Sequence, residues 1–245
     1  MAVSCTLSQC HAKNDGLTGN SFTFKALLVA SVLSIGLALP LRATTIYDNS
    51  SNDLLTRFNP GTNEVGDEIL LVGTERYLTN FSFEFWAANT ASPTSFAGAV
   101  EAQVRFYQNN GPNFNGYPTP GTMFWSSGWF SVPSPTDRST FVFTEGADFP
   151  AGGLFLPSTD MTWSVQFEGM GATDSVGVDI YSPPTVGQDY PDYWENDGGW
   201  QLLTNSVPMD FAARMDASIP EPSVATLAIL GGLGILGIAT RLRRK

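Results

Sequence analysis

Hydrophobic and polar residues alternate along several segments of the chain. Side chains at every second position of a β-strand point to the same face, so this alternation predicts strands with one buried face. Aromatic and β-branched residues supply most of the apolar positions, as is typical of strands. The segments with this pattern are residues 81–85, 100–106, 141–143, 161–168, 176–180 and 211–215.

Loops rich in Asn, Gly and Pro separate these segments, notably at 109–121 and 131–137. Residues 44–216 contain no ten-residue stretch with the period of an amphipathic helix, and no alternation of strands with helices. We therefore expect an all-β fold, a single antiparallel β-sandwich of jelly-roll type with seven or eight strands. Residues 44–216 are long enough for one domain with its own core.

The amino-terminal region resembles a signal peptide. Lys25 precedes an apolar stretch at 26–39, and Ala43 offers a small residue for cleavage. A buried core helix fits less well, because the stretch is apolar on every side and follows a polar leader. We expect residues 1–43 to be an export signal that is removed near Ala43.

The carboxy-terminal region has three parts in a fixed order. A linker at 217–223 contains Pro220, Glu221 and Pro222, and an apolar run follows at 224–240. This run predicts a transmembrane helix, and the basic residues after it predict a cytoplasmic end. The basic cluster at 241–245 consists of Arg241, Arg243, Arg244 and Lys245.

The order of these three parts resembles the PEP-CTERM sorting signal of Gram-negative bacteria. The resemblance implies that an exosortase processes the tail after export by the Sec machinery. It also implies an inner-membrane-anchored precursor that moves to the cell envelope or extracellular matrix, in association with exopolysaccharide. The alternative is an ordinary carboxy-terminal membrane anchor behind a proline-rich linker.

The composition of the exported part excludes several kinds of chemistry. Residues 44–222 contain 22 acidic residues and no Lys, His or Cys, so this part is more negative than the whole chain at −11. Without these residue types there is no Ser-His-acid triad, thiol nucleophile or disulfide. Nucleic acid is not expected as a partner, because phosphate binding needs cationic contacts. The only basic residues in this part are Arg57, Arg76, Arg105, Arg138 and Arg214.

An acidic and aromatic segment lies at 189–200. Its carboxylates Asp189, Asp192, Glu195 and Asp197 predict a calcium site, since calcium prefers oxygen ligands. Its rings Tyr193 and Trp194 could stack on sugars. The alternative is a solvated turn, with the aromatic residues covering one edge of the sandwich.

A second aromatic segment at 123–130 contains Trp125 and Trp129, which could also bind polysaccharide. The alternative, favoured by the dominance of aromatic residues in sandwich cores, is an edge or core strand with a bulge at Gly128.

Carboxylates alone can hydrolyse glycosides, so a carbohydrate-active enzyme on the sandwich is the alternative function. No acidic pair stands out for this role, and the candidates are all expected in turns or at the rim, namely Asp67, Glu68, Glu145, Asp148 and Asp160. We expect no catalytic residues and an exported, non-enzymatic surface or matrix protein.

Overall fold

The computed structural model describes residues 43–219, and every regular element in this range is a β-strand. The export signal, the Pro-Glu-Pro motif, the apolar run and the basic cluster lie outside the described residues. Within 43–219 there is no helix long and apolar enough to cross a membrane. The strands are β1 (Thr44–Asn49), β2 (Asp53–Phe58), β3 (Glu64–Leu70), β4 (Tyr77–Asn89), β5 (Glu101–Gln108), β6 (Asn113–Phe114), β7 (Tyr117–Pro118), β8 (Met123–Ser126), β9 (Phe130–Ser131), β10 (Thr136–Thr144), β11 (Leu154–Phe155), β12 (Asp160–Glu168), β13 (Asp174–Tyr181), β14 (Gln188–Asp189), β15 (Asp192–Asn196), β16 (Trp200–Thr204) and β17 (Ala213–Ser218).

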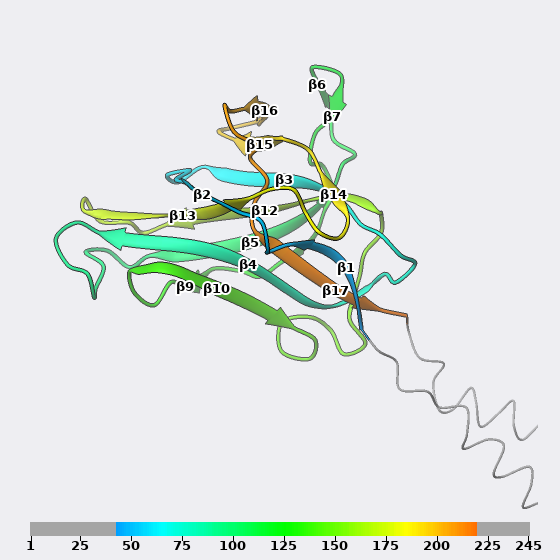
Figure 1. Cartoon of the computed structure of the whole chain (residues 1–245), viewed down its shortest axis with the longest axis horizontal. Helices are drawn as coiled ribbons and strands as arrows, with labels where there is room; N and C mark the ends of the chain where they lie inside the picture. The colour runs from blue at the N-terminus through cyan, green and yellow to red at the C-terminus, as the bar shows by residue number, and fades with distance from the viewer. Residues whose placement is uncertain (1–42, 220–245) are drawn as a thin grey trace, which may run out of the picture. The chain divides into compact units, whose positions relative to one another are not determined.

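The strands form two large antiparallel sheets and one small hairpin (Figure 1). The seven-stranded sheet follows the path β1-β17-β4-β13-β2. Strands β17 and β13 pair with successive parts of one edge of β4, and β10 and β11 pair with its opposite edge. The eight-stranded sheet has the order β16-β15-β3-β12-β5-β8, with β14 beside β3 and β9 beside β5. This all-β, sandwich-like architecture confirms the fold class expected from the sequence, whereas the jelly-roll connectivity stays a prediction.

The core lies between the two large sheets. Phe81 of β4 packs edge-on against Phe106 of β5 at 5.0 Å and against Trp163 of β12 at 5.3 Å between ring centroids. These three side chains are fully buried. Burial of aromatic area of this size is the main favourable term for folding a domain without disulfides.

The six alternating segments lie in β4, β5, β10, β12, β13 and, for 211–215, around the start of β17. Strands β1, β2, β3, β15 and β16 were not predicted. Strand β3 shows why: Glu64, Asp67 and Glu68 interrupt its apolar residues, yet Glu64 and Asp67 are buried. The alternation of hydrophobic and polar residues does not predict a strand when polar side chains on both of its faces are buried.

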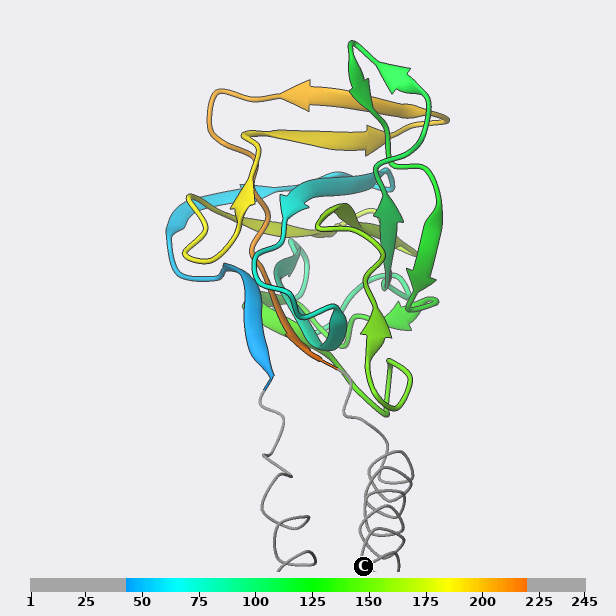
Figure 2. The same cartoon turned by 90° about the vertical axis from the view of Figure 1, so that its right-hand side faces the viewer.

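The first and last strands of the domain pair with each other, with Thr44 opposite Ala217. Strand β17 ends at Ser218, so the linker begins two residues later than the expected 217. Figure 2 shows β1 and β17 running to one end of the domain, while the β15–β16 and β6–β7 hairpins lie at the other end.

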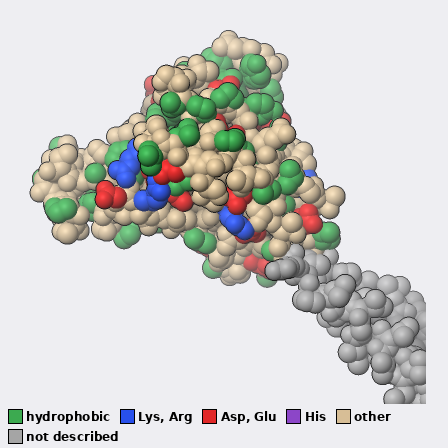
Figure 3. Space-filling view, viewed as in Figure 1, with side chains coloured by type: hydrophobic (Ala, Val, Ile, Leu, Met, Phe, Trp, Pro, Cys, Tyr) green, Lys and Arg blue, Asp and Glu red, His purple; other side chains and the backbone are tan. Residues whose placement is uncertain are grey.

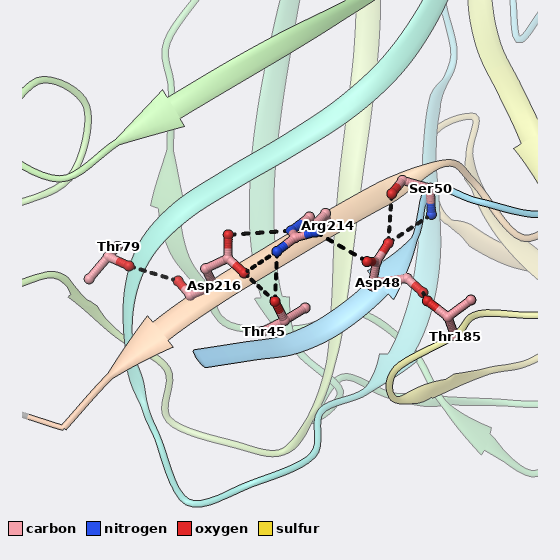
Figure 4. Close-up of polar contacts among 7 residues, drawn as sticks. All are labelled: Thr45, Asp48, Ser50, Thr79, Thr185, Arg214 and Asp216. Atoms are coloured by element: carbon pink, nitrogen blue, oxygen red, sulfur yellow. Dashed lines mark hydrogen bonds and ion pairs between the residues drawn. The ribbon is translucent and has the colours of Figure 1, made fainter. Parts of the chain in front are cut away.

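Arg214 ties these two strands together (Figure 4). Its guanidinium lies 3.3 Å from Asp48 and donates to the Thr45 hydroxyl at 2.7 Å, both on β1. It also pairs with Asp216 on its own strand at 3.1 Å. The hydrogen bond from the Thr45 hydroxyl to Asp216 at 2.6 Å closes this network.

Candidate functional site

The outward face of the eight-stranded sheet carries a continuous set of polar side chains. Strand register places Arg105 beside Ser164, Ser164 beside Gly66, and Gly66 beside Trp194, so these residues share one face across four strands. We call this side of the sheet the polar face; its members Thr162, Ser164 and Trp194 are fully buried and Glu64 is 5% exposed, while the others are half-buried. Its members are Gln103, Arg105 and Tyr107 on β5, Asp160, Thr162, Ser164 and Gln166 on β12, Glu64 and Glu68 on β3, Asp192, Trp194 and Asn196 on β15, and Trp200 on β16.

Glu64 is the centre of the first half of the polar face. One carboxylate oxygen accepts hydrogen bonds from the Ser164 hydroxyl at 2.6 Å and the Tyr107 hydroxyl at 3.0 Å. The other oxygen lies 3.0 Å from the Arg105 guanidinium. Burial and the Glu64 charge both raise the pKa of Tyr107. Glu64 is therefore a compensated buried charge, held by three strands.

The Tyr107 ring also reaches toward the β15–β16 hairpin. It meets the Trp200 ring edge-on, with 5.5 Å between centroids. Trp200 is half-buried, so part of its ring stays open to solvent beside the Glu64 group. An aromatic ring next to hydrogen-bonding side chains is the usual composition of a site that binds sugars or other polar ligands.

Glu68 is the centre of the second half. It accepts a hydrogen bond from the Trp194 indole at 3.1 Å, and Asp160 is its carboxyl neighbour. Burial, and then the charges of Asp160 and Asp192, raise the pKa of Glu68 to about 7. The expectation that Glu68 and Asp160 lie in turns or at the rim was wrong, because both are strand residues on this face. A carboxyl group that titrates near neutrality can donate or accept a proton.

A third acidic group lies in the interior, on the opposite side of β3. Asp67 is fully buried and accepts a hydrogen bond from the Phe211 backbone amide at 2.7 Å. Asp189 accepts one from the Tyr47 hydroxyl at 2.8 Å and has the carboxyl group of Asp210 as its neighbour. Burial and the neighbouring carboxylates raise the pKa of Asp67, and they raise that of Asp189 to about 7. The expectation that Asp67 lies in a turn or at the rim was also wrong, because Asp67 is a fully buried residue of β3.

The four carboxylates of the expected calcium site do not come together. Asp189 contacts Tyr47, and Glu195 accepts a hydrogen bond from Asn63 at 2.6 Å. Asp192 and Glu195 lie on opposite faces of β15, since they are three residues apart. Asp197 lies in the exposed turn between β15 and β16. Among residues 43–219, no three acidic side chains are arranged as metal ligands.

The four aromatic residues expected to bind a ligand differ in exposure. Tyr193 is 9% exposed and packs edge-on against Phe58 in the core, and Trp194 is fully buried. Trp125 is half-buried and stacks on Phe106 at 4.7 Å between centroids. Trp129 is 38% exposed. Tyr193 and Trp194 therefore present no ring face to solvent, whereas Trp129 does.

Residues 123–130 form strands at the edge of the sheet, which is the alternative that the sequence offered to a ligand-binding segment. Strands β8 and β9 both pair with β5 at the edge of the sheet, and Gly128 between them has a φ of 67°. Only glycine adopts this conformation at low cost, so the chain bends there.

The grouping of Glu64, Arg105 and Tyr107 was not predicted from the sequence. Arg105 alternates with the apolar residues of its strand, which predicts an outward position and nothing more. Register between β3, β5 and β12 brings the group together, and register between distant strands cannot be read from one sequence. A scan of protein-family models, a search of curated proteins and a search of solved structures each found no match for this chain.

Proposed function

We propose that the chain is an exported, non-enzymatic domain, delivered to the cell envelope or extracellular matrix by its carboxy-terminal tail. One observation carries the proposal: Pro220, Glu221 and Pro222, the apolar run at 224–240 and the basic cluster at 241–245 stand in sorting-signal order. The tail makes the inner membrane, the Sec machinery and an exosortase the expected partners.

The boundaries of the domain support this proposal. Strand β1 begins at Thr44, next to the expected cleavage site, and β17 ends at Ser218, two residues before Pro220. The pairing of these two strands makes 44–218 a closed structural unit. Processing at either end would therefore leave the sandwich intact.

The polar face supports polysaccharide as the ligand. Sugars bind through hydrogen bonds to carboxylates and amides and through stacking on aromatic rings. Buried Glu64 holds Arg105 and Tyr107 in place, and the half-buried side chains of Gln103, Gln166 and Trp200 beside them are the ones that a sugar can reach. The high acidic content of the domain disfavours polyanionic partners such as nucleic acid.

The intact mass of the protein recovered from envelope and medium tests the sorting part of the proposal. A chain that starts near Thr44 and ends near Pro220–Pro222, with or without added mass, is the expected result. A chain that retains residues 224–245 in every fraction would mean that the tail is a plain membrane anchor.

Binding is tested by titrating the purified protein with isolated matrix polysaccharide. We expect Trp200→Ala to weaken binding severalfold, because it removes the exposed ring of the polar face. Trp129→Ala is the matched control: Trp129 is exposed but lies next to β9, outside the polar face. Equal loss in both variants, or no response to a broad panel of polysaccharides, would remove this part of the proposal.

A carboxylate-dependent glycoside hydrolase is the second candidate, and the neighbouring Glu68 and Asp160 favour it. A carboxyl group with a pKa of about 7 next to a second carboxyl has the properties of a general acid. Release of reducing sugar by the protein, abolished by Glu68→Gln or Asp160→Asn, would establish this activity in place of simple binding.

A further inference from the structure

Three strands end side by side where the described chain leaves the domain. Tyr77, the first residue of β4, is the cross-strand partner of Ser218 on one side and of Phe155 on the other. Ser218 is the last residue of β17, so Ile219 follows at the same point. Figure 1 shows this end of β17 at the lower right, away from the β6–β7 and β15–β16 hairpins.

Apolar side chains are exposed at this end. Phe155 is 54% exposed and Ile219 is 50% exposed. The Tyr77 ring lies against Phe155, with 5.4 Å between ring centroids. We call Tyr77, Phe155 and Ile219 the exit row. Strand β11 is an edge strand here, and no described element covers Phe155.

A positive charge adjoins the exit row: Arg76 directly precedes Tyr77 and forms no ion pair with a carboxylate of residues 43–219. Arg76 donates its hydrogen bonds to the backbone carbonyls of Glu75 at 2.6 Å and Gly73 at 3.0 Å. The four other arginines of residues 43–219 each form an ion pair with a carboxylate, and Arg76 does not. A tyrosine, an arginine and exposed apolar side chains in one place are the composition of a membrane-interface contact.

The length of the linker limits what this end of the domain can reach. Only residues 219–223 separate β17 from the apolar run at 224–240. Five extended residues span at most about 18 Å. The headgroup region of a bilayer is about 5–8 Å thick on each side. A tail inserted in the membrane therefore holds the exit row within reach of the lipid headgroups.

We propose that the exit row docks on the outer surface of the inner membrane while the tail is retained, with the headgroup region of a phospholipid bilayer as its partner. The inference rests on the proposed membrane-anchored stage. The inserted tail acts as a tether that keeps the exit row close to the membrane and so raises its effective concentration there. A few side chains are then enough to hold the domain against the membrane surface. Release of the tail would remove the tether, and the small exit row alone would not hold the domain to lipid.

The test uses the chain from Thr44 to Lys245, without the expected export signal, because the apolar stretch at 26–39 could otherwise hold the protein in the membrane. The vesicles contain phosphatidylcholine and phosphatidylglycerol whose acyl chains carry bromine close to the headgroup, which quenches nearby tryptophan. Phe155→Trp places a reporter in the exit row. Val142→Trp is the matched control, because Val142 is also 54% exposed and pairs with Ser82, five residues along β4 from Tyr77. That separation is about 17 Å along the sheet.

We expect the emission added by Phe155→Trp to be quenched at least twofold and the emission added by Val142→Trp to be unaffected. Adding Arg76→Gln to the Phe155→Trp chain should reduce the quenching. The same quenching at both reporters, or at neither, in vesicles that retain the chain after a carbonate wash would overturn docking while leaving the anchored stage intact. Loss of the chain in the carbonate wash would instead show that the tail is not inserted, and both proposals would fail.

Discussion

The Tyr47 hydroxyl donates a hydrogen bond to Asp189 at 2.8 Å and thereby joins β1 to a buried acidic group. Asp67 and Asp210 complete this group, and each has one buried oxygen without a hydrogen-bond partner. None of the arginine ion pairs of residues 43–219 involves these three carboxylates. Several negative charges in one buried place are costly, and binding a proton removes part of that cost.

Stability should therefore fall as pH rises from about 4 to about 7. Burial and the Asp210 charge raise the pKa of Asp189 to about 7, while an unfolded aspartate titrates near 4. Between these values the folded state binds more protons than the unfolded state, so the free energy of unfolding decreases with pH. Denaturant unfolding at pH 4.5 and 7.5 should show a decrease on the order of 1–3 kcal/mol.

Asp189→Asn should flatten this pH dependence, because the amide resembles the protonated carboxyl and carries no charge. We expect the variant to be more stable than the wild type at pH 7.5 and similar at pH 4.5. Asp197→Asn, in the exposed β15–β16 turn, is the control and should keep the wild-type slope. A wild-type protein that gains stability over this pH range would contradict the prediction.

Acidic and basic side chains lie side by side on the face of the molecule drawn in Figure 3. Asp179, on the outward face of the seven-stranded sheet, depends on two arginines from distant strands. Its side chain is 1% exposed, and it lies 3.6 Å from Arg57 of β2 and 3.8 Å from Arg138 of β10. Arg138→Gln should destabilise the domain by about 1–3 kcal/mol, since it leaves a buried charge less compensated. Thermal and denaturant unfolding would measure this loss.

A double-mutant cycle tests the cause of that loss. Asp179→Asn should make the Arg138→Gln change less costly, because the most deeply buried of the carboxylates beside Arg138 is then neutral and only Asp53 and Glu84 still need its charge. Arg76→Gln is the control, with an expected effect below about 0.5 kcal/mol, since Arg76 forms no ion pair with any carboxylate in the described range 43–219. Additive effects of Arg138→Gln and Asp179→Asn would show that the ion pair is not the reason.

Calcium should not stabilise the domain through the four carboxylates of residues 189–197. Asp192 and Glu195 face opposite sides of β15, so closing them around one ion would require β15 to unpair from β3 and β16. Melting curves with a chelator and with added calcium should coincide. A rise of several degrees with calcium, lost in Asp192→Asn, would contradict this and restore the site predicted from the sequence.

Local patterns predicted the strands with a single buried face, and the packing of β4 against β5 and β12 follows from their alternating aromatic residues. They did not predict the polar face or the buried acidic group. Glu64 and Asp67 lie three residues apart on β3 and point to opposite faces, and each is buried by partners from other strands. Whether an acidic residue is solvated or buried depends on those long-range partners, which sequence spacing does not encode.

The ion pair between Arg214 and Asp48 joins β17, the strand that leads to the tail, with β1, the first strand of the domain (Figure 4). Arg214→Met keeps much of the apolar stem but removes the contacts to Asp48, Thr45 and Asp216. Two carboxylates are then left without their cation, and β1 should open more often than the rest of the sheet. Hydrogen exchange of the β1 amides should accelerate about tenfold, which corresponds to roughly 1.4 kcal/mol of local stability, while exchange in β12 stays unchanged. Equal acceleration in β1 and β12 would mean that Arg214 supports the whole domain and does not specifically fasten its two ends.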